Sequence, residues 1–200
     1  MKIKLLSITG LLLIAFTAPA QNKDMVVTAA GDTIHCEITH SLLGGDLKYR
    51  TSKDQKAIKI TIDNINAYYI ADQSKWVRKI YYKGGQHYKA GRSFMTVLES
   101  GKINLYEEIE TYAVNSHSVG PMFGTSSTSS YKLWYVAKGN DTAALIKGDF
   151  SSRQKRKNEF AEFLADNKTV YDMYMSYNGL SFDKLRNLVH LYNTGQPLSN

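Results

Sequence analysis

The chain has 200 residues, of which 25 are Lys or Arg and 18 are Asp or Glu, so its formal net charge at pH 7 is +7. This length suits one domain with a buried core and argues against a second full-sized domain. The single cysteine, Cys36, excludes an internal disulfide, so the fold depends on its core alone.

Residues 1–20 have the pattern of a bacterial signal peptide. Lys2 and Lys4 precede a mostly apolar run at residues 5–16, and the Ala-Pro-Ala sequence ending at Ala20 offers small residues where signal peptidase reads them. We therefore expect cleavage near Ala20 and an exported, periplasmic or extracellular, mature protein. The apolar run is too short to span a bilayer permanently, so we expect no transmembrane span in the mature chain.

The basic charge balance bears on the class of partner. Removal of residues 1–20 takes away Lys2 and Lys4 and leaves a net charge of +5. A positive balance often indicates nucleic acid, but export argues against that partner, and we expect none. An envelope protein, a glycan or anionic lipid headgroups are the alternatives, and the charge can also serve solubility alone.

Residues 21–150 alternate apolar and polar positions in short segments separated by turn signals, which predicts an antiparallel β unit. Gly31-Asp32 separates the first two segments, and a glycine with positive φ suits such a turn. Ser100-Gly101 and residues 139–141 predict two further hairpins. The predicted strands cover residues 25–30, 33–42, 46–52, 58–62, 65–70, 75–83, 92–99, 102–112, 131–137 and 142–147. About ten short strands favour an antiparallel meander, either barrel-like or a sandwich, because both arrangements cover strand edges.

One segment of the β unit, residues 114–130, has a different composition. It contains six serines, two glycines and a proline, and Met122 and Phe123 are its large apolar residues. Such a composition buries too little apolar surface to offset the entropy of ordering, so we predict a long mobile loop at 114–130.

Residues 151–200 show the periodicity of helices rather than strands. Three amphipathic helices are predicted, and the third begins after Ser181 and stops at Gly195. Its apolar stripe consists of Phe182, Leu185, Leu188, Val189 and Tyr192. Because the helices cannot bury their apolar faces separately, we expect a helical tail packed on the β unit, which makes the fold class α+β.

No motif for catalysis, for a metal ion or for a cofactor stands out in the sequence. Cys36 shares its strand face with Ile34 and Ile38, which predicts a buried and inert thiol. The five histidines lack the spacing of zinc sites, and no phosphate-binding glycine motif is present. We therefore assign no catalytic residue, no metal ligand and no cofactor.

Aromatic and basic residues provide weak candidates for ligand binding. Neighbouring aromatic residues on a strand place one ring on each face, and rings beside basic groups can stack on sugars or contact a protein. A dense basic run at the start of the first predicted helix opposes the helix dipole, which favours a role in contacting anions. The candidates are Trp76, Tyr82, Trp134, Arg153, Lys155, Arg156 and Lys157. The alternative is that the rings are core residues and the basic run is a solvated helical turn.

The order of these features resembles a loosely defined set of uncharacterised exported proteins of Gram-negative bacteria. The resemblance rests on Gly-Asp-Thr-Ile at residues 31–34, on residues 97–107, on the aromatic strand at residues 134–140, and on residues 188–193. It implies a shared β-rich fold with a helical tail, and export. It transfers no activity and no site.

These observations predict an exported cell-envelope protein that acts as a non-enzymatic binding or interaction module. The alternative is a hydrolase whose site is assembled across strands. A deep cleft with converging polar groups favours the hydrolase, whereas a shallow aromatic or basic surface favours binding.

Overall fold

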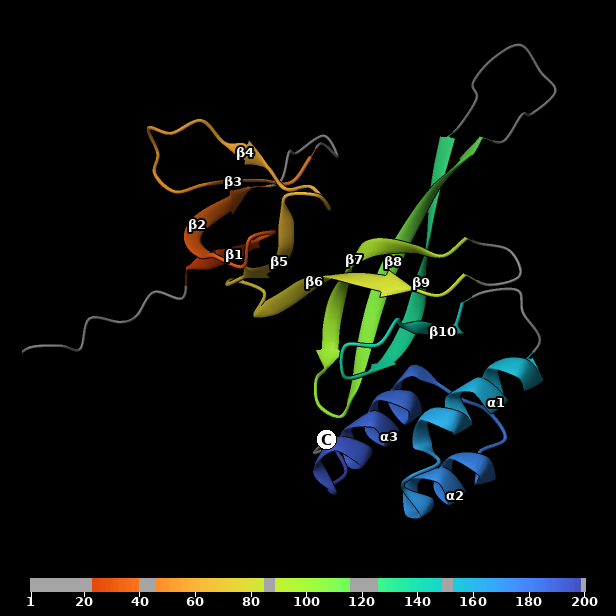
Figure 1. Cartoon of the computed structure of the whole chain (residues 1–200). Coiled ribbons are helices and arrows are strands. Elements are labelled where there is room, and N and C mark those ends of the chain that lie inside the picture. Colours follow the sequence, from red (N-terminus) through yellow and green to blue (C-terminus); the bar gives the residue numbers. More distant parts are fainter. Residues whose placement is uncertain (1–22, 40–45, 85–88, 116–125, 149–152, 199–200) are drawn as a thin grey trace, which may run out of the picture.

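The computed structural model describes residues 23–39, 46–84, 89–115, 126–148 and 153–198, and for residues 111–115, 126–129 and 153–156 it describes the backbone. The fold is α+β: a ten-stranded antiparallel sheet is followed by three packed helices (Figure 1). This confirms the predicted fold class. The predicted signal peptide at residues 1–20 lies outside the described residues.

The first half of the sheet, which we call the N-terminal half, consists of five strands. These are β1 (Asp24–Thr28), β2 (Thr33–Thr39), β3 (Lys48–Arg50), β4 (Ile58–Lys59) and β5 (Ile65–Ile70). Strands β1 to β4 follow one another as neighbours, but β5 returns to pair with β1 rather than with β4. The strands enclose a small core of Val26, Cys36, Tyr49, Ile60 and Ile65.

Two local features shape the N-terminal half. Gly31 has a φ of 97° in the turn between β1 and β2, as predicted for this glycine. The carboxylate of Asp24 accepts hydrogen bonds from the main-chain N–H groups of Ile38 and Ala71, both at 2.8 Å. One side chain therefore joins the start of β1 to the ends of β2 and β5.

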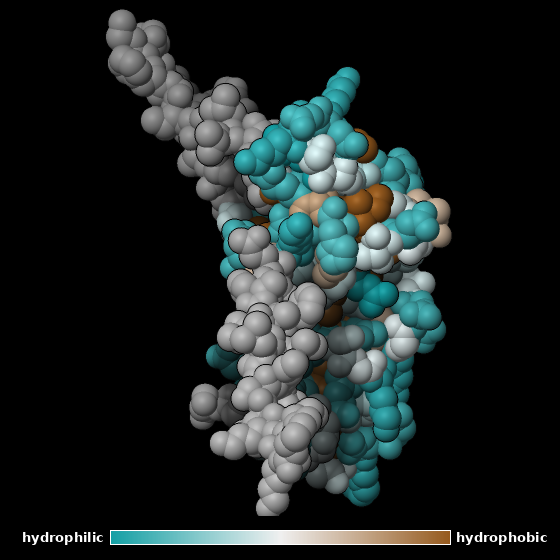
Figure 2. All heavy atoms as spheres, turned by 90° about the vertical axis from the view of Figure 1, so that its left-hand side faces the viewer, coloured by the Kyte–Doolittle hydropathy of each residue, from teal (hydrophilic) through white to brown (hydrophobic). Residues whose placement is uncertain are grey.

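Figure 2 shows hydrophobic atoms gathered in the upper part of this side of the molecule, with hydrophilic atoms around them.

The second half of the sheet, the C-terminal half, continues from β5. Its strands are β6 (Lys75–Tyr82), β7 (Gly91–Glu99), β8 (Ile103–Asn115), β9 (Ser126–Lys138) and β10 (Ala144–Lys147). Each pairs with the next in sequence, so the order of the whole sheet is β10-β9-β8-β7-β6-β5-β1-β2-β3-β4.

The C-terminal half curls back on itself. Tyr82, at the end of β6, forms a parallel bridge with Ala143, next to β10. The N–H of Ala143 donates to the carbonyl of Tyr81 at 2.8 Å, and the N–H of Lys83 donates to the carbonyl of Ala143 at 2.9 Å. The curled sheet encloses a core of Ile80, Met95, Tyr106, Leu133, Tyr135, Ala137, Ala143 and Leu145. Of the two predicted arrangements, this half takes the barrel-like one.

The bounds predicted for the loop, residues 114 and 130, are both wrong. Strand β8 continues to Asn115, strand β9 begins at Ser126, and these two residues pair with each other. Residues 116–125, with Met122 and Phe123, lie outside the described residues. Composition misled the prediction because main-chain hydrogen bonds along a hairpin do not require apolar side chains, and Ser and Thr are compatible with a two-stranded ribbon.

The three helices are α1 (Arg153–Leu164), α2 (Lys168–Ser176) and α3 (Phe182–Thr194). The side chain of Ser181 accepts from the N–H of Lys184, and Gly195 closes α3 with a φ of 74°, so both predicted ends are confirmed. The predicted stripe of α3 is largely buried, with Leu185, Leu188 and Val189 inaccessible to solvent. No helix in the described part of the chain combines the length and apolar character required to cross a bilayer.

The helices cover the outer face of the curled sheet (Figure 1). Residues of β8, β9 and β10 that point away from the inner core meet the helices, as alternation along a strand requires. The shared core includes Ile103, Leu105, Trp134, Val136, Ile146, Phe160, Leu164, Val170, Leu185, Leu188 and Val189.

Polar side chains anchor α3 on the sheet. The amide of Asn193 pairs with the main chain of Ile103, accepting from its N–H at 2.9 Å and donating to its carbonyl at 2.7 Å. The carboxylate of Glu99 accepts from Arg186 at 2.6 Å and lies 3.1 Å from His190 Nδ1. These contacts fix the helical tail to the β7–β8 hairpin, so it packs as part of one unit.

Candidate functional site

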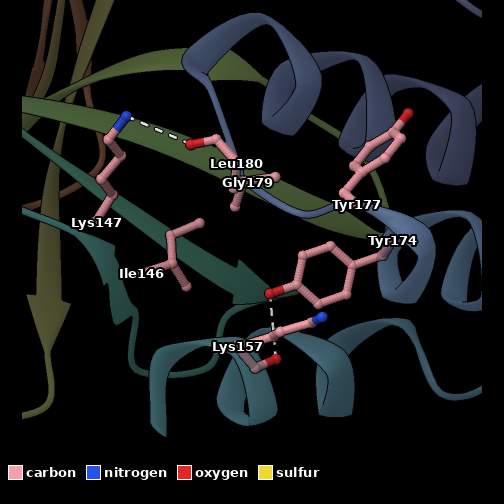
Figure 3. A pocket seen from close by; sticks show the side chains of 7 residues that line it. All are labelled: Ile146, Lys147, Lys157, Tyr174, Tyr177, Gly179 and Leu180. Carbon is pink, nitrogen blue, oxygen red and sulfur yellow. Dashed lines mark hydrogen bonds between the residues drawn. The ribbon is translucent and has the colours of Figure 1, made fainter. Parts of the chain in front are cut away.

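A pocket of about 340 Å³ lies where β10, α1 and the connection between α2 and α3 meet (Figure 3). Its volume falls within the range of small-molecule sites. Seven residues line it: Ile146, Lys147, Lys157, Tyr174, Tyr177, Gly179 and Leu180. We call this cavity the lysine pocket.

Elements distant in sequence position these residues. Ile146 is buried against the helices. A register shift between Leu145 and Lys147 places Lys147 directly opposite Trp134, so Lys147 lies on the same helix-facing side of the sheet as that residue. Lys157 lies in α1, and Tyr174 lies near the end of α2, where its ring meets Phe160 edge-on at 5.0 Å. Packing of the two helices against β10 therefore creates the pocket.

Two lysines supply the charge of the lysine pocket. Lys147 Nζ donates to the carbonyl of Leu180 at 3.5 Å, and Lys157 Nζ donates to the carbonyl of Met175 at 3.4 Å. Both bonds are at the long limit for N–H donors, so each is weak. No carboxylate of the described residues lies within ion-pair distance of either ammonium group. The pocket thus carries two positive charges without a neutralising side chain from the described part of the chain.

Two tyrosines form much of the wall. The hydroxyl of Tyr174 donates to the main-chain carbonyl of Lys157 at 3.2 Å, and burial raises the pKa of Tyr174 to about 12. Tyr174 therefore stays neutral at physiological pH and adds no negative charge. The ring of Tyr177 is half-buried, and Lys184 Nζ lies 4.9 Å from its centroid. In Figure 3 the Tyr177 hydroxyl points away from Ile146.

The indole of Trp134 lies next to the side chain of Lys147. Lys147 Nζ lies 4.2 Å from the centroid of the indole, a distance that favours a cation–π interaction. The ring also packs on Phe182 with centroids 4.7 Å apart. Trp134 is 7% exposed, and no acceptor in the described residues lies within hydrogen-bond distance of its Nε1. The indole is a core group that holds the lysine side chain over its face.

The structure brings together only some of the predicted site residues. Trp134 and Lys157 lie at the lysine pocket, Trp134 through Lys147 and Lys157 as a lining residue. Three further candidates, Arg153, Lys155 and Arg156, belong to the first turns of α1, just before Lys157. The structure describes only their backbone.

Trp76 and Tyr82 lie elsewhere, on β6. Tyr82 is half-buried in the curled sheet with its ring centroid 5.5 Å from that of Tyr135. Burial and, secondarily, the charges of Glu108 and Glu110 raise the pKa of Tyr82. Trp76 is exposed and is not among the described residues that line the lysine pocket.

Sequence reasoning missed the other lining residues. Tyr174 and Tyr177 have the spacing of a core stripe in the second predicted helix, and Gly179 and Leu180 read as a helix stop followed by a linker. The basic run was the usable signal, because it led to Lys157. Only the packing of α1 and α2 against β10 shows which basic residue reaches the cavity.

The groups suited to catalysis have other roles. Cys36 is buried, and burial, with a smaller contribution from the charge of Asp24, raises the pKa of its thiol to about 11. A thiol in that state is a poor nucleophile at neutral pH. His190 and Glu99 tie α3 to β7. Within the described residues, no group of three or more His, Cys, Asp or Glu side chains has a geometry that could hold a metal ion.

Comparisons of the chain with protein-family models, with curated proteins and with solved structures give no match.

Proposed function

We propose that the protein is an exported, non-enzymatic binding module that holds a phosphate group in the lysine pocket. The observation that carries this proposal is the pair of ammonium groups, Lys147 and Lys157, whose present partners are main-chain carbonyls at 3.4–3.5 Å. An anion beside either ammonium group replaces a weak bond by a charge-assisted one, which is shorter and stronger.

The cations of the pocket are compatible with a phosphate group. The described lining contains lysine but no arginine. Arginine presents a planar fork that matches a carboxylate or a phosphate, whereas a lysine ammonium is a compact point charge with three donors that also binds phosphate. The apolar walls, Ile146, Leu180 and the ring of Tyr174, suit the carbon part of a phosphate ester.

Calorimetric titration of the protein without residues 1–20 tests the proposal. The probes are glycerol 3-phosphate in solution and vesicles of phosphatidylglycerol, with phosphatidylcholine vesicles as the reference for a net-neutral surface. We expect glycerol 3-phosphate to bind. The vesicle arm then separates a soluble phosphate ester from a lipid headgroup as the source of the group.

The decisive variant is Lys147→Gln with Lys157→Gln. Loss of a charge-assisted hydrogen bond weakens affinity by about tenfold or more. The matched control is Lys56→Gln with Lys102→Gln, which removes the same charge at two exposed sites away from the pocket. Equal weakening by both double variants, or no binding by the unaltered protein, would overturn the proposal.

Export rests on residues 1–20 and has its own measurement. Mass spectrometry of the protein isolated from its native host is expected to show a chain that begins at Gln21. A chain that retains Met1 would contradict export without bearing on the phosphate site.

A further inference from the structure

A second cavity, of about 740 Å³, lies where the two halves of the sheet join. We call it the Trp76 groove. The described residues that line it are Val27, Asn66, Ala67, Ser74, Trp76, Arg78, Lys79, Tyr81, Val97 and Ser100. It shares no residue with the lysine pocket.

Strand register places the central lining residues on one face. Val27 of β1 is opposite Ala67 of β5, and Ala67 is opposite Arg78 of β6. Residues directly opposite in antiparallel strands project to the same side, as do residues two apart along a strand. Trp76 therefore lies on the same face as Arg78, and its own partner across the strands is Tyr69.

Trp76 is exposed but held in place. The residue is 38% exposed. The centroid of its ring lies 5.2 Å from that of Tyr69, and the two ring planes meet at 40°. An exposed indole whose position is fixed by a second ring gives a flat apolar surface that requires little ordering on binding. Such a surface suits the C–H face of a sugar ring.

The charge of the groove is positive. Arg78 and Lys79 line it, and none of its described lining residues is acidic. Arg78 has no ion pair with a carboxylate of the described residues. A smaller cavity of about 210 Å³ continues from Arg78, Lys79 and Tyr81 to residues 139–142, where Asp141 contributes a negative group at the far end.

Polar side chains of the groove have free acceptor capacity. The amide of Asn66 donates to the carbonyls of Thr28 and Ala29, at 3.0 and 3.3 Å, which leaves its side-chain oxygen as an acceptor. Ser100 donates its hydroxyl to Asn104 at 3.2 Å and likewise retains lone pairs. Sugar hydroxyls are the donors that these atoms can accept.

We propose that the Trp76 groove binds an acidic saccharide, with the indole of Trp76 against a sugar ring and the guanidinium of Arg78 paired with a sugar carboxylate. The planar fork of arginine matches a carboxylate through two parallel hydrogen bonds. This site is separate from the lysine pocket, so a negative result for one proposal does not contradict the other.

Titration with a galacturonic acid trimer, followed by tryptophan fluorescence and calorimetry, tests the assignment. The chain has two tryptophans, and Trp134 is buried, so a change in emission on binding reports on Trp76. The neutral galactose trimer is the reference ligand and is expected to bind about tenfold more weakly, because it lacks the charge-assisted pair.

Two variants and a control decide the result. Trp76→Ala and Arg78→Gln are each expected to weaken binding of the acidic trimer by about tenfold. Arg50→Gln removes one arginine charge in the N-terminal half, where Arg50 pairs with Glu37, and is expected to change the affinity less than twofold. Trp76→Phe keeps an aromatic ring and is expected to restore most of the affinity. Lys147→Gln with Lys157→Gln is expected to leave saccharide binding unchanged.

The proposal is overturned if the unaltered protein binds no acidic trimer, or if Trp76→Ala and Arg78→Gln bind it as well as Arg50→Gln does. Equal affinity for the neutral and acidic trimers overturns the role of Arg78. Circular dichroism of each variant separates lost binding from lost folding.

Discussion

The N-terminal and C-terminal halves of the sheet bury their strands to different degrees. Strand β2 alternates, with Cys36 buried between exposed His35 and Glu37. In β9, by contrast, the five residues from Leu133 to Ala137 are all buried, because the curled sheet covers one face and the helices cover the other. The N-terminal half has one core, and the C-terminal half lies between two.

This difference determines how much each half contributes to the stability of the fold. A residue buried under a second layer loses contacts on all sides when it is truncated, whereas a residue at the margin of a single small core allows its surroundings to relax. We therefore expect equal chemical changes to have unequal effects in the two halves. Three changes test this expectation.

Leu188→Ala should have the largest effect. Leu188 is inaccessible to solvent in the core between α3 and the sheet, so the cavity is expected to lower the free energy of unfolding by about 2–5 kcal/mol. The matched change is Leu47→Ala in the half-buried margin of the N-terminal core, for which less than half of that loss is expected. Urea unfolding followed by circular dichroism measures both, and an equal loss in the two variants would contradict the comparison.

Cys36→Ser should have an intermediate effect. Cys36 is buried beside Ile34 and Ile38, and a hydroxyl that finds no partner there costs about 1–3 kcal/mol. Burial also raises the thiol pKa from 9.0 to about 11, so the folded state retains this proton to higher pH than the unfolded state. Stability is then lost as pH rises from 9.0 through about 11, and the loss should be smaller in Cys36→Ser. Rapid reaction of the native thiol with a bulky maleimide at neutral pH would disprove its burial.

Replacement of residues 116–125 by Asn-Gly should have the smallest effect. Asn115 pairs with Ser126, so a two-residue type I′ turn can join them directly. Because closure entropy varies slowly with loop length, we expect a change within about 1 kcal/mol. The β8–β9 ribbon extends beyond both cores of the C-terminal half (Figure 1), so a large loss of stability would reveal a third region of packing.

Local patterns predicted most of the elements. Alternation and turn glycines located ten strands, and Ser181 and Gly195 marked the ends of α3. Composition failed at Ser126–Ser130, because pairing with β8 satisfies that backbone without apolar side chains. The pairing of β5 with β1 could not be predicted from the sequence either, because no local signal distinguishes pairing with β1 from pairing with β4.

The candidate sites were less accessible to sequence reasoning. Lys157 and Trp76 were identified as weak candidates, but their partners come from other elements. Lys147 joins Lys157 only through packing of α1 on β10, and Tyr69 meets Trp76 only through the register of β5 and β6. Long-range contacts of this kind leave no periodic trace in the sequence.

The anchor between Asn193 and Ile103 has a consequence for folding kinetics. It joins groups 90 residues apart, so the entropy of closing that long segment must be offset before the contact forms. The core of the N-terminal half draws on residues 26–65 and can assemble while the rest of the chain is still emerging from a ribosome. The outer face of β8, β9 and β10 must instead wait for α3, and an interrupted chain leaves that apolar face exposed to aggregation. A chain that ends before residue 193 is therefore a substrate for chaperones and proteases rather than a smaller version of the protein.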